Sequence, residues 1–232
     1  MMTVKLLDHG YLKFIEGWGS DRRIVEAARM STDKGFLGWG TEENPGDEKL
    51  LRYLYKNKHD TPFEMGGLII EVQAPIFVFR EWHRHRTQSY NEMSARYTPL
   101  PNLNYIPTVE RLLINSTGSN KQAGTVDGAA QLTRAGAQEF RRELKVSYAA
   151  AQKLYERALK RGVPKELARV HLPVGRYSRM RASANLRNWL AFVTLRSASG
   201  AQWEIRQYSN EVRGLLAKRF PRTLKLFAEG RL

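Results

Sequence analysis

The pattern of apolar and polar positions predicts a strand with a helix close behind it in the first half of the chain. Residues 67–73 read Gly-Leu-Ile-Ile-Glu-Val-Gln, a short run rich in branched apolar side chains that is typical of a strand. Pro75 suits the first turn of a helix, which we expect over residues 76–85. Residues 59–64 contain a proline, which disfavours helix at the residue before it, so we expect a turn there. Residues 89–97 are expected to be extended or looped.

Apolar residues at helical spacing predict further helices along the rest of the chain. We expect them from Asp21 to about Ala28, from about Leu50 to Asn57, from about Phe140 to Gly162, from Pro164 to about Leu172, over 183–199 and over 202–219. Two Gly-rich stretches interrupt this pattern. Residues 35–47 are expected to form a loop, and residues 116–138, poor in apolar side chains, a mobile surface insertion. The chain shows no internal repeat and no clear domain boundary. Its 232 residues fit one domain, or a domain with a subdomain, and we expect one domain over 1–232.

The charge of the chain is strongly positive and unevenly distributed. The chain has a formal net charge of +15, and residues 151–232 contain 18 Lys and Arg but five Asp and Glu. A cationic half attracts polyanions, which could be nucleic acid, phosphorylated metabolites or anionic cofactors, and a solvated basic surface is the alternative. The sequence contains no helix-turn-helix, RNP or zinc module, so nucleic acid is not the partner that we expect. It also lacks the glycine patterns of Rossmann and P-loop turns and the Gly-x-Ser-x-Gly of hydrolases.

Cysteine is absent, which excludes disulfides, thiolate metal sites and a cysteine nucleophile. A pyrimidine methylation that begins with a thiolate is therefore excluded as well. No apolar run approaches the ~18 residues of a membrane span, and the first residues lack the apolar core of a secretory signal. We expect a cytoplasmic protein with no membrane partner.

Residues 84–96 form the densest polar cluster of the chain. They read Arg-His-Arg-Thr-Gln-Ser-Tyr-Asn-Glu-Met-Ser-Ala-Arg. If the chain is extended from Glu92, then Glu92, Ser94 and Arg96 share one face and span roughly 13 Å, about the size of a mononucleotide. A guanidinium, a hydroxyl and a carboxylate suit a phosphate and a sugar or an imide N–H. The alternative is an exposed charged turn.

Other candidate residues are weaker when taken one at a time. His83 and His85 are two residues apart, so on a helix they point different ways, and we expect no metal site. His59 is a candidate because of its place in the 59–64 turn, although a packing role is the simpler interpretation. Arg169 has apolar neighbours, and a buried arginine needs an anionic partner. On the helix expected over 183–199, Asn185 and Arg196 fall within ~20° of each other, which places Arg196 at a polar–apolar edge.

The segment 84–96 resembles the signature of flavin-dependent thymidylate synthases and matches it at every fixed position. Supporting stretches extend over most of the chain. They include Ala28–Ser31, His59–Glu64, Ala74–Phe77, Tyr105–Pro107, Glu166–Arg169, Leu172–Pro173, Asn185–Arg187, Leu195–Arg196 and Ala201–Glu204.

The resemblance implies a reaction and a fold. The family transfers a methylene group from methylenetetrahydrofolate to C5 of dUMP, with FAD reduced by NADPH as the hydride source, and yields dTMP and tetrahydrofolate. It implies an α/β fold of α+β character, in which helices flank a central, mostly antiparallel sheet and the C-terminal half is helical. It also implies a homotetramer whose active sites are shared between subunits, and no enzyme nucleophile, which agrees with the missing cysteine.

The resemblance also assigns residues. Those implied to hold FAD are Thr61, Arg84, His85, Arg86, Glu92, Asn185 and Arg187. Those implied to hold dUMP are Glu81, Arg84, Glu92, Met93, Ser94, Ala95, Arg96, Arg169 and Arg196. Arg196 is the implied catalytic residue, since a guanidinium beside the uracil favours loss of its N3 proton and makes C5 a better nucleophile. A related enzyme that uses a different uridine acceptor, for example RNA, is the alternative within the family.

Three positions depart from the family pattern. Glu81 stands where the family usually has Gln, and its carboxylate would repel a phosphate but could accept from a sugar hydroxyl. Gly200 replaces a frequent His, and Ala191 stands where an amide side chain is common. These departures concern cofactor and substrate affinity more than the type of reaction.

Overall fold

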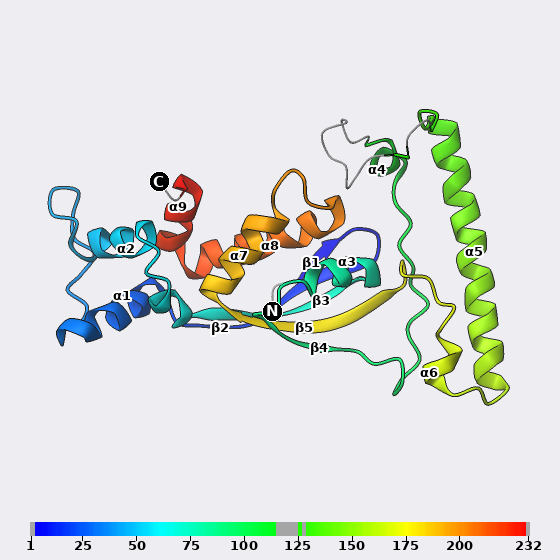
Figure 1. The fold of residues 1–232 in the computed structure, drawn as a ribbon, viewed down its shortest axis with the longest axis horizontal. Helices are drawn as coiled ribbons and strands as arrows, with labels where there is room; N and C mark the ends of the chain where they lie inside the picture. Colours follow the sequence, from blue (N-terminus) through cyan, green and yellow to red (C-terminus); the bar gives the residue numbers. More distant parts are fainter. Residues whose placement is uncertain (1–2, 115–124, 127–128, 231–232) are drawn as a thin grey trace.

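The computed structural model describes residues 3–114, 125–126 and 129–230, and its centre is a twisted sheet (Figure 1). The strands pair in the order β1-β2-β3-β5-β4, and every neighbouring pair is antiparallel. Their bounds are β1 Thr3–Leu6, β2 Gly10–Trp18, β3 Gly67–Pro75, β4 Ser89–Glu92 and β5 Tyr177–Asn185. The mostly antiparallel sheet implied by the resemblance is confirmed.

Helices cover one face of this sheet. The helical elements are α1 Asp21–Arg29, η1 Met30–Thr32, α2 Gly46–Lys56, η2 Thr61–Glu64, α3 Ile76–Trp82, α4 Val109–Leu113, α5 Arg134–Lys160, α6 Lys165–Ala168, α7 Leu186–Arg196, α8 Trp203–Arg219 and α9 Pro221–Glu229. In the part of the chain described, no helix is long and apolar enough to cross a membrane.

The core lies between the sheet and α3, α7 and α8. Ile70 and Val72 of β3 are fully buried, whereas Glu71 between them is half-buried on the opposite face. This alternation follows from the pleat of a strand, which sends successive side chains to opposite faces. Trp189 of α7 is fully buried and donates its ring N–H to the main-chain oxygen of Leu68 at 3.1 Å. The contact fixes α7 on the sheet.

Several helix predictions are confirmed and three need correction. The helix expected from Pro164 to about Leu172 is the short α6, which ends at Ala168. The helix that begins at Ile76 ends at Trp82, three residues earlier than expected. The helix expected over 183–199 begins at Leu186, because residues 177–185 form β5. Buried and exposed side chains alternate along residues 177–185, as in a strand with one open face. The helix prediction overlooked this period of two.

The insertion expected over 116–138 is wrong in its last part. Residues 134–138 belong to the first turns of α5, and Thr133 caps this helix by accepting from the main-chain N–H of Gly136 at 3.1 Å. Residues 115–124 and 127–128 lie outside the described part of the chain.

Helix α5 stands apart from the sheet, along one side of the molecule (Figure 1). Its contacts with the body include Gln152, which accepts from the buried Arg176 at 2.6 Å, and the fully buried Tyr155. Phe140, Val146 and Leu154 on the same helix are 44%, 70% and 44% exposed. Helix α5, which has 27 residues, therefore carries apolar surface that the rest of the described chain does not cover.

Candidate functional site

The guanidinium of Arg196, at the last residue of α7, is held from three directions. Its Nε donates to Nε2 of His85 at 2.9 Å, and its Nη2 donates to the main-chain oxygen of Glu81 at 2.9 Å. Its Nη1 donates to Oε2 of Glu81 at 2.5 Å. The Arg196 side chain is 15% exposed. A guanidinium has five N–H bonds, so two of them are left for a ligand.

His85 is a neutral ring in this arrangement. Its Nε2 accepts from Arg196, so the ring proton lies on Nδ1, and the ring packs edge-on against Phe192 with 4.9 Å between centroids. Burial, and after it the charge of Arg196, lowers the pKa of His85 from 6.5 to about 4. His85 therefore orients Arg196 without adding a second positive charge.

The lowered pKa of His85 predicts a pH-dependent component of stability. Above pH 6.5 the ring is neutral in both the folded and the unfolded chain, so its packing contributes fully. As the pH falls from 6.5 towards 4, the unfolded chain binds the proton first and the free energy of unfolding decreases. His85→Gln should lack this component. Denaturant unfolding midpoints of both proteins at several pH values measure it, and parallel pH curves would contradict the assignment.

Three of the residues implied to hold the flavin, Thr61, Asn185 and Arg187, gather where β5 passes into α7. Asn185 caps α7, since its Oδ1 accepts from the main-chain N–H of Asn188 at 3.0 Å. Arg187 donates to Oε1 of Glu64 at 2.6 Å and is 49% exposed. The exposed Thr61 opens the η2 turn that carries Glu64.

The predicted alignment of Asn185 and Arg196 on one helical face is wrong. Asn185 precedes the helix and Arg196 is its last residue, so the 11 residues of α7, roughly 16 Å, lie between them. The two residues therefore mark the two ends of α7. The loop with Arg84 and Arg86 is tied to this helix, because Asn188 donates to the main-chain oxygen of Thr87 at 3.1 Å.

The second half of the 84–96 segment does not continue as one extended face. Strand β4 ends at Glu92, and the chain turns where the N–H of Tyr97 donates to the main-chain oxygen of Ser94 at 3.0 Å. In this turn Ser94 Oγ accepts from the main-chain N–H of Arg96 at 3.3 Å. The prediction of a common extended face for Glu92, Ser94 and Arg96 is therefore wrong, because the chain forms a turn after Glu92. Ala95 lies buried within it.

Arg169 lies beside this turn. It caps the C-terminal end of α6, and the first residue of α6, Lys165, donates to the main-chain oxygen of Tyr97 at 2.9 Å. Arg169 is half-buried. The structure thus brings Ser94, Arg96 and Arg169 to one region.

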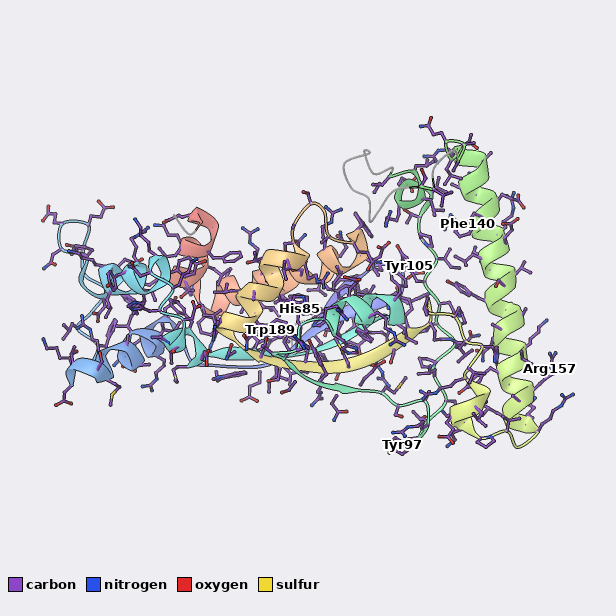
Figure 2. The ribbon with its side chains drawn as sticks, viewed as in Figure 1. His85, Tyr97, Tyr105, Phe140, Arg157 and Trp189 are labelled. Atoms are coloured by element: carbon purple, nitrogen blue, oxygen red, sulfur yellow. The ribbon has the colours of Figure 1, made fainter. Side chains whose placement is uncertain are left out.

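Asn185, at the start of α7, and the turn after Met93 lie near opposite ends of β5. Asn185 is its last residue, whereas the N–H of Met93 donates to the main-chain oxygen of Arg179, six residues earlier and roughly 20 Å away. Figure 2 shows the same separation, with His85 beside α7 and Tyr97 beyond the other side of β5, next to α6. Arg196 lies with α3 and α7 on the helix-covered face of the sheet, whereas Met93, next to the Ser94 turn, lines the open face.

The site region is rich in arginines without carboxylate partners. Among the residues described, no ion pair is formed by Arg84, Arg86, Arg96 or Arg169. Arg84 and Arg86 are exposed. Guanidinium groups that are not neutralised by the protein favour anionic ligands, above all phosphates. The donor set therefore fits the diphosphate of a dinucleotide cofactor such as FAD.

His59 lies apart from the Arg196 cluster. It follows α2, its main-chain N–H donates to the oxygen of Leu54 at 2.9 Å, and its ring packs edge-on against Tyr53 at 5.5 Å. These contacts favour a packing role.

A hollow on the open face of the sheet was not predicted. It has a volume of about 350 Å³ and is lined by Glu71, Asn91, Met93, Arg179, Met180 and Arg181. The alternation of Arg179 and Arg181 with the buried Met180 and Ala182 was a strand signal that could have placed both arginines on one face.

Comparisons with known proteins agree with the resemblance in the 84–96 segment. The family model described as "Thymidylate synthase complementing protein" matches residues 13–222. A flavin-dependent thymidylate synthase of Thermosipho africanus is 37% identical over 226 residues, 97% of this chain and 94% of the relative. One from Thermus thermophilus is 37% identical over 228 residues, 98% of this chain and 79% of the relative.

A solved structure has the same fold over almost its whole length. The UMP/dUMP methylase PolB from Streptomyces cacaoi, bound with 5-Br dUMP, superposes with a TM-score of 0.82 at 31% identity and covers 99% of both chains. Its complex with 5-Br UMP superposes with a TM-score of 0.81 at 32% identity and the same coverage. The chain belongs to the thymidylate synthase complementing protein family, the family of flavin-dependent thymidylate synthases.

Proposed function

We propose that this chain is a flavin-dependent thymidylate synthase that converts dUMP to dTMP with methylenetetrahydrofolate as the carbon donor. The observation that carries the proposal is the guanidinium of Arg196, held rigidly with two N–H bonds left for a ligand, in a chain without cysteine. A C5 methylation without a thiolate needs another way to make the uracil electron-rich. A fixed cation beside the ring oxygens is such a way.

We assign to FAD the residues Thr61, Arg84, His85, Arg86, Glu92, Asn185 and Arg187. When bound and reduced by NADPH, FAD supplies the hydride of the reaction. Arg84 and Arg86 would hold the diphosphate, because they are exposed and have no carboxylate partner in the described chain. Thr61 offers a hydroxyl in the η2 turn, and the bond of Arg187 to Glu64 ties this turn to the start of α7. His85 also orients Arg196.

The nucleotide is assigned to the turn after β4 and to α6. Ser94 Oγ, Arg96 and Arg169 would hold the phosphate of dUMP, with main-chain groups of Met93 and Ala95 beside them. Arg96 and Arg169 form no ion pair with another described residue, so their guanidinium groups are available for the phosphate dianion. The positive charge of the C-terminal half suits dUMP, FAD, NADPH and folate, which are all anionic.

We further propose a homotetramer whose active sites are shared between subunits. The phosphate residues and the Arg196 cluster lie on different sides of β5, so a second copy would bring its Ser94–Arg96 turn to the Arg196 of the first. The exposed apolar side chains of α5 add surface that assembly would cover. We place this enzyme in the cytoplasm, where its nucleotide and folate substrates are available.

A second candidate acceptor is UMP. The solved relative that superposes over 99% of this chain is described as a UMP/dUMP methylase and has been crystallised with both brominated nucleotides. Glu81 is compatible with this acceptor, because a carboxylate oxygen could accept from an additional ribose hydroxyl.

The acceptor is determined by direct competition. We expect the purified protein to be yellow, NADPH to bleach the flavin, and dTMP to form from dUMP faster than ribothymidylate forms from UMP. Uridine in RNA serves as the third acceptor. Faster turnover of UMP or of RNA would replace the proposed substrate, and a well-folded tetramer that binds neither FAD nor dUMP would refute the proposed function.

A further inference from the structure

Glu81 has two contacts with the guanidinium that we assign to the uracil. Its carboxylate accepts from Nη1 of Arg196 at 2.5 Å, and its main-chain oxygen accepts from Nη2 at 2.9 Å. The Glu81 side chain is 44% exposed, and its second carboxylate oxygen forms no hydrogen bond with the described residues. The residue therefore fixes the plane of the guanidinium and also brings a negative charge to it.

The polar groups around Arg196 come from α3 with the loop behind it, and from α8. Glu81 belongs to α3, and the neutral ring of His85 belongs to the loop behind α3. From α8, which packs against α7, the group next to the end of the helix is the hydroxyl of Ser209, bonded to Ser197 at 2.8 Å. Within the described residues, Glu81 is thus the carboxylate that forms an ion pair with Arg196.

This arrangement opposes the role of Arg196 in one respect. A guanidinium stabilises negative charge on the uracil, whereas a carboxylate a few ångströms from the same ring repels it. A glutamine at this position could accept from Arg196 with its amide oxygen but would carry no charge. The geometry of the clamp and its charge can therefore be separated by one substitution.

We propose that Glu81 is a positioning and charge-tuning residue of this site. Its side chain orients Arg196, and its negative charge limits how strongly the bound uracil is held in the anionic form. The inference rests on the proposed function, since it places the uracil beside Arg196.

Two variants of the FAD-loaded enzyme test the proposal. Glu81→Gln keeps an acceptor for Nη1 and removes the charge, whereas Glu81→Ala removes both. The probes are dUMP and 5-bromo-dUMP, whose bromine makes the N3 proton more acidic. Where the pH is high enough for N3 to lose this proton to the buffer, the ligand binds as the anion. Calorimetric dissociation constants between pH 6 and pH 9, roughly the range that spans the ionisation of such imides, measure the preference for the anion.

Glu81→Gln should increase the preference for 5-bromo-dUMP over dUMP by about tenfold at the pH where the brominated uracil ionises, the equivalent of one pKa unit. Glu81→Ala should lose more turnover than Glu81→Gln, because only the amide still orients Arg196. Glu143→Gln on the exposed side of α5 removes the same charge elsewhere and should leave the preference unchanged.

The same preference in wild type and in Glu81→Gln at every pH would overturn the charge-tuning role. Equal turnover in Glu81→Ala and wild type would overturn the positioning role. Failure of the wild-type enzyme to bind either nucleotide would instead refute the proposed function, so the two failures are distinguishable.

Discussion

Replacing Arg196 by alanine is expected to lower kcat for dTMP formation by about 10²–10³-fold, the usual cost of removing a fixed charge stabiliser from an active site. The substitution takes away the group that stabilises negative charge on the uracil while the reaction proceeds. The flavin spectrum should persist, because the residues assigned to the diphosphate lie on the loop before β4. Steady-state rates with saturating dUMP and folate measure the effect.

Structural damage must be separated from the catalytic effect. Arg196 is bonded to Glu81 and His85, so its loss frees a partly exposed carboxylate and a neutral ring, and circular dichroism should show an intact fold. Arg213→Ala, on the exposed side of α8, is the matched control and should retain full activity. Near-normal turnover in Arg196→Ala would remove Arg196 from the mechanism.

Mixing two inactive variants is expected to restore activity. If each active site takes Arg96 from one subunit and Arg196 from another, then Arg96→Ala and Arg196→Ala tetramers are each inactive. Random reassembly of equal amounts gives about one site in four with both arginines intact, as closed symmetric oligomers with shared sites require. We therefore expect about a quarter of the wild-type rate after dissociation and reassembly.

The control for this experiment uses two residues of the same region. Arg96→Ala and Arg169→Ala both damage the phosphate end, beside the Ser94 turn and α6, so no mixed site recovers both. Their mixture should stay as inactive as its parents. Restoration in this control, or its absence in the first mixture, would show that the site is not divided as proposed.

The sequence predicted the chemistry of the site better than its geometry. The segment 84–96 was identified by residue types, and phosphate-binding residues must be of certain types wherever they lie in the fold. The pairing of Arg196 with Glu81 and His85 was not foreseen. It depends on how α3 and α7 pack on the same sheet, which brings together residues more than 100 positions apart.

Local patterns succeeded where one period dominated. The strand at β3 and the helices at α2 and α8 were predicted, since their apolar residues repeat at one clear spacing. Strand β5 was missed because its open face carries Arg179 and Arg181, and the helix pattern that begins at Leu186 was extended back across it. Strands β1 and β2 were not predicted, because half-buried polar and aromatic side chains weaken their alternation.

The fate of the folate carbon tests the central claim most directly. The FAD-loaded protein is incubated with dUMP, NADPH and methylenetetrahydrofolate labelled with ¹³C in its methylene group, and both products are identified by mass spectrometry. We predict dTMP with the label in its C5 methyl group and tetrahydrofolate as the folate product, because the hydride comes from the flavin. Unlabelled dTMP, dihydrofolate as the folate product, or oxidation of NADPH without any dTMP would contradict it.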